Sequence, residues 1–144
     1  MTIYKNNTKK IAALAKHLGC ETSEIRRANY SDSTYEHGIC EYLIYTDSEA
    51  DKACKESILD SAWAFNISFI SDHMRAPLNS EGIKAFAAMQ NKLCESANAL
   101  VLAVIRCPKK FVKDAISADG RGHFLAGYDH NETEAGRYFI YRTN

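Results

Sequence analysis

The side chains best suited to catalysis or ligand binding gather in one stretch near the carboxyl end, DGRGHFLAGYD at 119–129. Its three glycines separate charged and aromatic side chains. Because closely spaced glycines disfavour both helix and strand, we expect a fixed, bent loop whose polar groups need partners. The candidate binding surface that this segment and the nearby Arg137 predict consists of Asp119, Arg121, His123, Tyr128, Asp129 and Arg137.

Two kinds of chemistry are open to this loop. His123 near the carboxylate of Asp129 could act as a general base, and Arg121 could hold a phosphate or a carboxylate. A structural interpretation competes with both: Arg121 would pair with Glu132 or Glu134, and His123 would hydrogen-bond across the loop. The glycine spacing matches no phosphate-binding motif, and no helix is expected to begin there. We therefore favour structure and recognition over catalysis, and predict no catalytic residue.

The sequence predicts no metal and no cofactor. Its five cysteines are odd in number, widely spaced, and form no Cys-x-x-Cys pair, so a zinc or redox motif is not visible. Free thiols in a reducing cytosol explain them. His123, Asp129 and His130 could ligate a metal, but nothing else at metal-ligand spacing supports them.

A second candidate site lies near the amino end, where residues 11–28 resemble a helix-turn-helix. In that geometry the side chains facing DNA would be Thr22, Ser23, Arg26 and Arg27, with Lys9, Lys10 and Lys16 near phosphates. Glu21 and Glu24 would repel phosphate at the leading edge of the recognition helix. Two helices packed on the core explain the same pattern, and we favour that interpretation.

Length and charge limit the functional classes. The 144 residues suit a single globular domain, 1–144, with 1–28 packed on the same core. Because 18 basic residues balance 18 acidic ones, a polyanion mimic is disfavoured and nucleic-acid binding is weakened. The amino end is polar, and the longest apolar run, 99–105, is too short to span a bilayer. These features predict a cytoplasmic protein without membrane contact.

The elements that must position these residues can be read from periodicity and turn signals. Residues 8–18 form one amphipathic helix, and a second short helix is expected over 22–28. The stretch 35–45 is predicted to be a strand pair or a bent strand, with the bend at His37-Gly38.

The second half of the chain is predicted to be mostly helical. Thr46 and Glu49 form a capping box that opens a helix. A long helix is expected over 81–105, most buried at 100–105, and Pro108 begins another that Gly120 ends. Residues 137–142 form a strand that pairs with 42–45. The fold class is α+β, helix-dominated, with a small antiparallel sheet made of strands near 35–45 and 137–142.

One family resemblance is visible in these motifs. The runs DGRGHFL, YD and YFIYRTN in 119–144, with YLIYTDSEAD and DSAWAFN in 42–66, are similar to those of small, largely uncharacterised proteins encoded by bacteriophages and plasmids. The resemblance covers roughly 35–69 and 111–144. Family members often carry Tyr-Asp-Gly-Glu-Glu where this chain has Tyr-Asp-His-Asn-Glu at 128–132, so the turn and its acidity differ here.

The resemblance implies an accessory protein of a mobile element, acting in a bacterial cytoplasm. Small proteins of that setting often block a host defence system by binding it, as anti-CRISPR proteins do. We therefore expect a non-enzymatic protein that binds a host protein complex, such as a defence ribonucleoprotein. Two alternatives stay open: a DNA-binding regulator using 8–28, and a small hydrolase or transferase built on His123 and Asp129.

Overall fold

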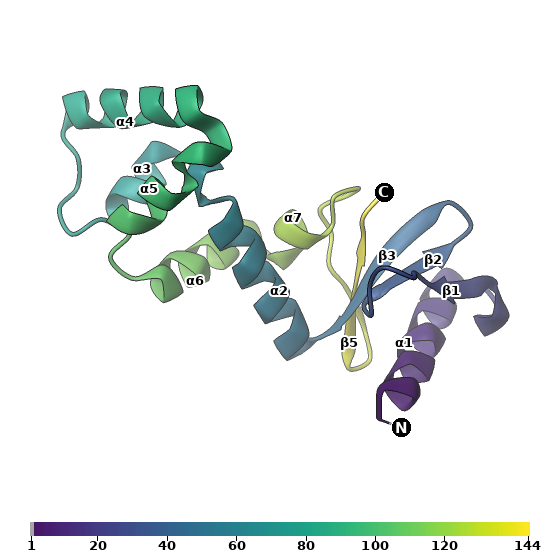
Figure 1. The fold of residues 1–144 in the computed structure, drawn as a ribbon. Helices are drawn as coiled ribbons and strands as arrows, with labels where there is room; N and C mark the ends of the chain where they lie inside the picture. The colour runs from purple at the N-terminus through teal and green to yellow at the C-terminus, as the bar shows by residue number, and fades with distance from the viewer. Residues whose placement is uncertain (1) are drawn as a thin grey trace. The chain divides into compact units, whose positions relative to one another are not determined.

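The structure, a computed structural model, describes the backbone of residues 2–144 and the side chains from Asn7 onward (Figure 1). It contains helices and an antiparallel five-stranded sheet, which confirms the α+β class. The chain divides into two compact units, described separately below: unit 1 comprises residues 2–54 and 119–144, and unit 2 comprises Lys55–Ala118. That these units form the one predicted domain stays a prediction.

Unit 1 is built on the five-stranded sheet, in the order β1-β2-β3-β5-β4. Its strands are β1 Ile25–Arg27, β2 Thr34–His37, β3 Cys40–Thr46, β4 Thr133–Ala135 and β5 Tyr138–Arg142. The predicted pairing of the two tyrosine-rich strands is confirmed, because Tyr42 faces Arg142 and Tyr45 faces Phe139 in an antiparallel register. The predicted bend is also confirmed: Gly38, at a φ of 61°, turns the chain between β2 and β3.

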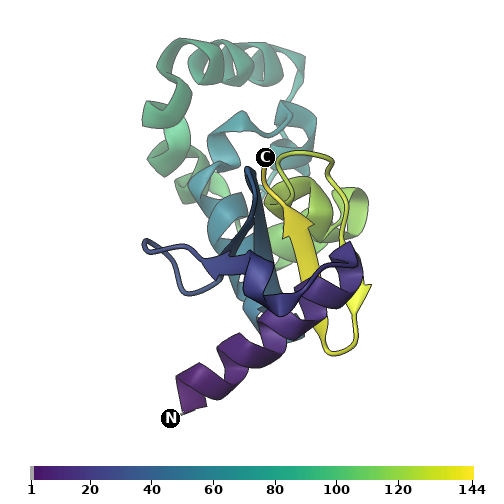
Figure 2. The ribbon, with the colours of Figure 1, turned by 90° about the vertical axis from the view of Figure 1, so that its right-hand side faces the viewer.

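Alternation along β5 gives the sheet two different faces. Helix α1 (Thr2–Leu18) lies across one face (Figure 2), where its Leu14 packs with Tyr138 and Ile140 in the core. Phe139 and Tyr141 therefore point to the opposite face. One face of the small sheet thus forms an apolar core with α1, and the other face carries Phe139 and Tyr141.

Helix α2 (Asp47–Asp60) begins with the predicted capping box. The Thr46 amide donates to Glu49 Oε2 at 2.8 Å, and the Glu49 amide donates to Thr46 Oγ1 at 3.3 Å. The buried Lys10 of α1 also donates to this carboxylate, at 2.8 Å. Burial alone would raise the pKa of Glu49, but the bonds from Lys10 and Thr46 outweigh it and hold the pKa below its usual value.

The predicted second helix near the amino end is wrong. Residues 22–24 form one turn of 3-10 helix, η1 (Thr22–Glu24), and the chain then enters the edge strand β1. Arg26 pairs with Glu36 on β2, and Arg27 lies 3.2 Å from Asp32. Strand pairing buries Ile25 against the core, which overrides the weak helical propensity of so short a segment. The proposed DNA-reading residues Thr22, Ser23, Arg26 and Arg27 therefore share no recognition helix.

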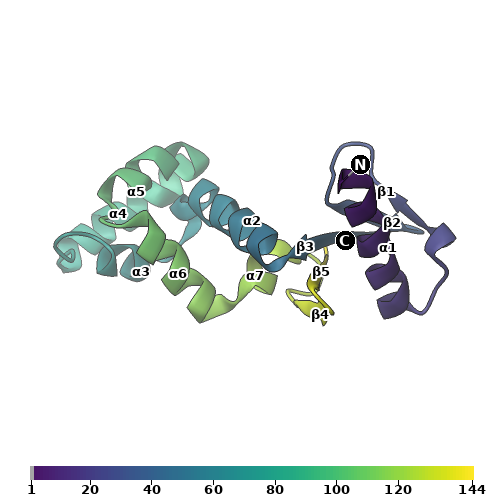
Figure 3. The same ribbon diagram turned by 90° about the horizontal axis from the view of Figure 1, so that it is seen from below.

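Unit 2 contains α3 Ile67–Asp72, α4 Ser80–Leu93, α5 Asn98–Val104 and most of α6 Pro108–Asp119 (Figure 3). The 3-10 turns η2 Ala62–Ala64 and η3 Cys94–Ala97 connect them. Phe65, Phe69 and Phe111 pack with ring centroids 5.0–5.6 Å apart, and Phe111, Val112 and Ala115 form the buried face predicted for α6.

The predicted long helix over 81–105 is broken at Cys94, whose φ is 49°. On either side of the break, Gln90 donates to the carbonyl of Trp63 at 2.7 Å, and Asn98 donates to that of Leu59 at 2.9 Å. These long-range hydrogen bonds satisfy backbone carbonyls around η2, and they stabilise the fold more than an unbroken helix would. The predicted maximum of burial at 100–105 is wrong as well, since Leu100 is 51% exposed while Val101 is buried. Of the helices described, none combines the length and apolarity needed to cross a membrane.

Candidate functional site

The segment 119–129 is tightly folded, but the prediction of a bent loop in which no helix begins is wrong in part, because residues 121–125 are helical. Gly120, at a φ of 80°, follows α6, and a short helix that the sequence did not predict, α7 (Arg121–Leu125), begins at the next residue. A Cβ on Gly122 would lie 2.5 Å from the carbonyl oxygen of His130, so the backbone passes too close for any side chain. The His130 amide donates to the Ala126 carbonyl at 2.8 Å, which closes the loop.

Arg121 is the centre of an ion-pair cluster on the sheet face opposite α1. Its guanidinium donates to Asp47 at 2.9 Å, to Asp51 at 3.0 Å and to Glu132 at 2.8 Å. It also lies over the ring of Phe139, 4.6 Å from the centroid, and its side chain is only 11% exposed. The structural pairing of Arg121 with Glu132 is confirmed. Because its donors are occupied within unit 1, Arg121 positions the loop and has little surface left for a partner.

The hydroxyl of Tyr141 donates to Glu132 as well, from the strand beneath. Burial raises the pKa of Tyr141, and the bond to Glu132 raises it further. Burial alone would lower the pKa of Arg121, but its bonds to Glu132 and the two aspartates outweigh this and raise it. The cluster therefore stays ionised at Arg121 throughout the physiological range and fastens the loop to both the sheet and α2.

The other predicted residues of the loop are exposed. Tyr128 is 58% exposed, and the guanidinium of Arg142 lies 3.7 Å from its ring centroid. Asp129 caps its own turn by accepting from the Asn131 amide at 3.0 Å. His123 stacks on His130 at 5.4 Å and forms no hydrogen bond to a carboxylate among the described side chains. Asp119 is exposed at the end of α6. The predicted pairing of His123 with a nearby carboxylate, which would orient the ring as a general base, is therefore not formed among these side chains.

Arg137 contributes to a different feature, a groove of about 630 Å³ on the α1 side of the sheet. We call it the α1 groove. One wall is α1 and the other is the turn between β4 and β5, and its lining residues are Lys9, Ala12, Ala13, Lys16, His17, Glu134, Ala135, Gly136, Arg137 and Tyr138. Alanines and a glycine face each other across it, so the hollow exists because both walls lack side-chain bulk.

The rim of the α1 groove is basic. Lys9, Lys16 and Arg137 are all exposed and enter no ion pair with any side chain that the structure describes. Glu134 is the one acidic residue of the lining, so three permanent positive charges stand against one negative charge, with His17 beside them. A basic rim over an apolar floor suits a ligand that carries both negative charge and apolar surface.

A smaller hollow of about 230 Å³ shares one lining residue, His17, with the α1 groove. Asp129 and Arg142 line this second hollow. The structure thus brings two predicted residues, Arg137 and Asp129, to one strip along α1, while Arg121 belongs to the opposite face of the sheet.

Sequence reasoning missed the α1 wall of the groove. Its members, Lys9, Ala12, Ala13, Lys16 and His17, recur at helical spacing on one side of α1. The signal available was two alanines flanked by basic residues on a single helix face. That pattern also fits an ordinary solvated face, and the opposite wall comes from a distant part of the chain.

Possible metal ligands gather elsewhere in unit 1. Among the described side chains, Cys20, Glu24 and His37 bring their ligand atoms within 4.8 Å of one another. His123, Asp129 and His130 do not form such a group.

Comparison with known proteins adds no relative to this geometry. A scan against protein-family models found no match, and neither curated proteins nor solved structures matched the chain. The resemblance to phage and plasmid proteins stays a prediction.

Proposed function

We propose that this chain is a non-enzymatic binding protein whose α1 groove captures an acidic segment of a partner protein. The observation that carries the proposal is the set of unpaired basic side chains, Lys9, Lys16 and Arg137, around an apolar floor of small residues. Unpaired charge of one sign beside a hollow favours a partner of opposite charge. The floor adds room for an aromatic or aliphatic anchor between the charges.

A protein segment fits this groove better than a nucleic acid does. Nucleic-acid binding draws its affinity from many phosphate contacts and usually from an excess of basic residues. Here the formal net charge is zero, and Glu134 stands on the rim where it would oppose a phosphate backbone. The helix expected to read DNA is also not formed.

The setting we propose is that of an accessory protein of a bacteriophage or plasmid, working in the bacterial cytoplasm. Its partner is a host protein complex, and specifically a defence ribonucleoprotein of the kind that anti-CRISPR proteins inhibit. The proposed setting and partner are supported by the resemblance of the motifs in 119–144 and 42–66 to those of bacteriophage and plasmid proteins. The groove supports it in one respect, since proteins that act by occupying a partner need a shaped surface and no catalytic group.

Affinity capture from a bacterial lysate tests the groove. The tagged chain is compared with a Lys16→Glu/Arg137→Glu variant, and with Lys84→Glu/Lys92→Glu, which makes the same charge change on exposed residues of α4. We expect the groove variant to lose its captured protein, while the α4 variant keeps it. Capture that both variants retain would contradict the proposal. Capture that disappears on nuclease treatment would assign the groove to nucleic acid instead.

The anti-defence role is tested with the same three proteins in cells. Each is expressed in a strain whose CRISPR system targets an infecting phage, and plaques are counted. We expect the natural chain and the α4 variant to restore plaques, and the groove variant to fail. If the natural chain restores no plaques but still captures a protein through the groove, the binding function stands and the target differs.

A further inference from the structure

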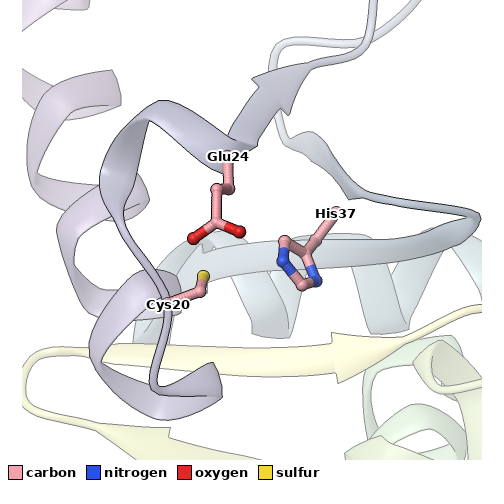
Figure 4. A group of neighbouring side chains, drawn as sticks. All are labelled: Cys20, Glu24 and His37. Atoms are coloured by element: carbon pink, nitrogen blue, oxygen red, sulfur yellow. The ribbon is translucent and has the colours of Figure 1, made fainter.

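At the carboxyl end of α1, three side chains from three elements converge on one space. Cys20 follows the helix, Glu24 ends η1, and His37 ends β2 (Figure 4). Figure 4 shows the thiol, the carboxylate and the imidazole pointing toward one another. Their ligand atoms lie within 4.8 Å of one another.

The local fold explains this convergence. Gly19, at a φ of 69°, reverses the chain, and the Cys20 amide donates to the Ala15 carbonyl at 3.0 Å, which is the helix-ending bond of a Schellman motif. Ile25 pairs with His37 in the β1–β2 register, so Glu24 arrives directly beside the histidine. Glu24 is held in turn by the Glu21 amide, which donates to its Oε2 at 2.7 Å.

Among the described side chains, none of the three groups forms an ion pair with a cation. Arg26 and Arg27, the basic residues that follow in the chain, are paired with Glu36 and Asp32. Within the part of the chain whose side chains are described, the Cys20 thiol and the His37 ring form no hydrogen bond or ion pair. A bound cation would give both donors a partner.

We propose that Cys20, Glu24 and His37 bind a divalent zinc ion, with a water molecule completing a tetrahedral site. Sulfur, nitrogen and oxygen donors together are the ligand set that zinc accepts, and three protein ligands leave one position open. Bond lengths to zinc place tetrahedral ligands about 3.5 Å apart. The Glu21 amide holds Oε2 of Glu24, so its Oε1 remains to ligate, and the three ligand atoms would draw together from within the 4.8 Å that separates them. On binding, the thiol gives up its proton to solvent and ligates as thiolate.

The ion would fasten the end of α1 to the β1–β2 hairpin within unit 1. This role is independent of the α1 groove, so loss of metal binding and loss of partner capture are separate results. Because binding to the folded chain alone raises its stability, Zn²⁺ is expected to raise the unfolding temperature of the natural protein.

Cobalt substitution tests the site directly. The full chain is stripped with a chelator and titrated with Co²⁺, whose thiolate charge-transfer absorption reports a sulfur ligand and whose intense visible bands report tetrahedral geometry. We expect one Co²⁺ per chain with both features, displaced by Zn²⁺. Cys20→Ser should abolish the charge-transfer absorption. His37→Gln and Glu24→Gln should each weaken Zn²⁺ affinity about 10- to 100-fold in competition with a chromophoric chelator, the range that loss of ligand support produces.

Matched controls separate this site from unspecific binding. Cys94→Ser and Cys107→Ser remove exposed thiols elsewhere, and His123→Gln removes an exposed imidazole. These variants should bind Co²⁺ as the natural chain does. No charge-transfer absorption in the natural protein, or absorption that survives Cys20→Ser, would overturn the proposal. Circular dichroism shows whether each variant is folded. If one of the three ligand variants is unfolded, the metal affinities of the other two test the site.

Discussion

Gly122 is the residue on which the shape of the carboxyl-terminal loop depends. We predict that Gly122→Ala lowers the free energy of unfolding by about 3 kcal/mol, because the new Cβ meets backbone rather than a movable side chain. Gly38→Ala is the control, since Gly38 has a positive φ but open space around it. It should cost about 1 kcal/mol. Denaturant unfolding followed by circular dichroism measures both, and equal costs would contradict the close approach.

For two tyrosines of β5, we predict opposite effects of a Tyr→Phe substitution on stability. The hydroxyl of Tyr138 is buried without a hydrogen-bond partner among the described residues, whereas that of Tyr141 donates to Glu132. Tyr138→Phe should therefore stabilise the chain by about 1 kcal/mol, and Tyr141→Phe should destabilise it by about 2 kcal/mol. The same unfolding experiment compares them. A loss of stability in Tyr138→Phe would mean that its hydroxyl has a partner after all.

At the scale of elements, the first turn of α2 gives a prediction about pH. The folded-state pKa of Glu49 lies below its unfolded value of about 4.5, so its contribution is present above that pH and is lost as pH falls through the folded pKa. Glu49→Gln keeps the capping geometry but removes the charge beside Lys10. It should cost about 1 kcal/mol at neutral pH, discounted for its partial exposure.

The variant should also lose less stability than the natural chain as the pH falls below about 4.5. Glu56→Gln, on an exposed position of the same helix, is the matched control and should follow the natural chain. Unfolding curves collected across this pH range provide the measurement. Parallel curves for Glu49→Gln and the natural protein would show that the pair with Lys10 adds no pH dependence.

Elements fixed by local chemistry could be predicted from the sequence, and those fixed by distant partners could not. Thr46 and Glu49 cap α2 within four residues, and Gly38 turns a hairpin between adjacent strands. The break at Cys94 instead follows bonds from Gln90 and Asn98 to a segment some thirty residues away. The hydrophobic periodicity of the sequence does not reveal hydrogen bonds to distant residues, and so it favoured one long helix.

The same distinction applies to the candidate site. The rigidity of the loop and the pairing of Arg121 follow from residues close together in the sequence. The α1 groove joins Lys16 to Arg137 across most of the chain. The proposed metal ligands Glu24 and His37 meet through the pairing of β1 with β2. Neither could be found without knowing which surfaces meet.

At the level of the whole molecule, we propose that the α1 groove recognises an acidic segment of a partner protein. Since the rim charges are exposed, the affinity for an acidic peptide should fall as the salt concentration rises. In Lys16→Glu/Arg137→Glu, most of this salt dependence should disappear. This is measured by titrating a labelled acidic peptide with the protein at low and at high salt and recording the fluorescence anisotropy of the peptide. Affinity that does not change with salt would argue that the rim takes no part.

The most direct measurement is the amide NMR spectrum of the isotope-labelled full chain during titration with a peptide of alternating Glu and Phe, compared with one of alternating Lys and Phe. Recognition through the α1 groove predicts shift changes confined to 9–17 and 134–138 with the acidic peptide. These changes should be absent in Lys16→Glu/Arg137→Glu and retained in Lys84→Glu/Lys92→Glu. Equal changes with the basic peptide, or changes located away from these two walls, would contradict it.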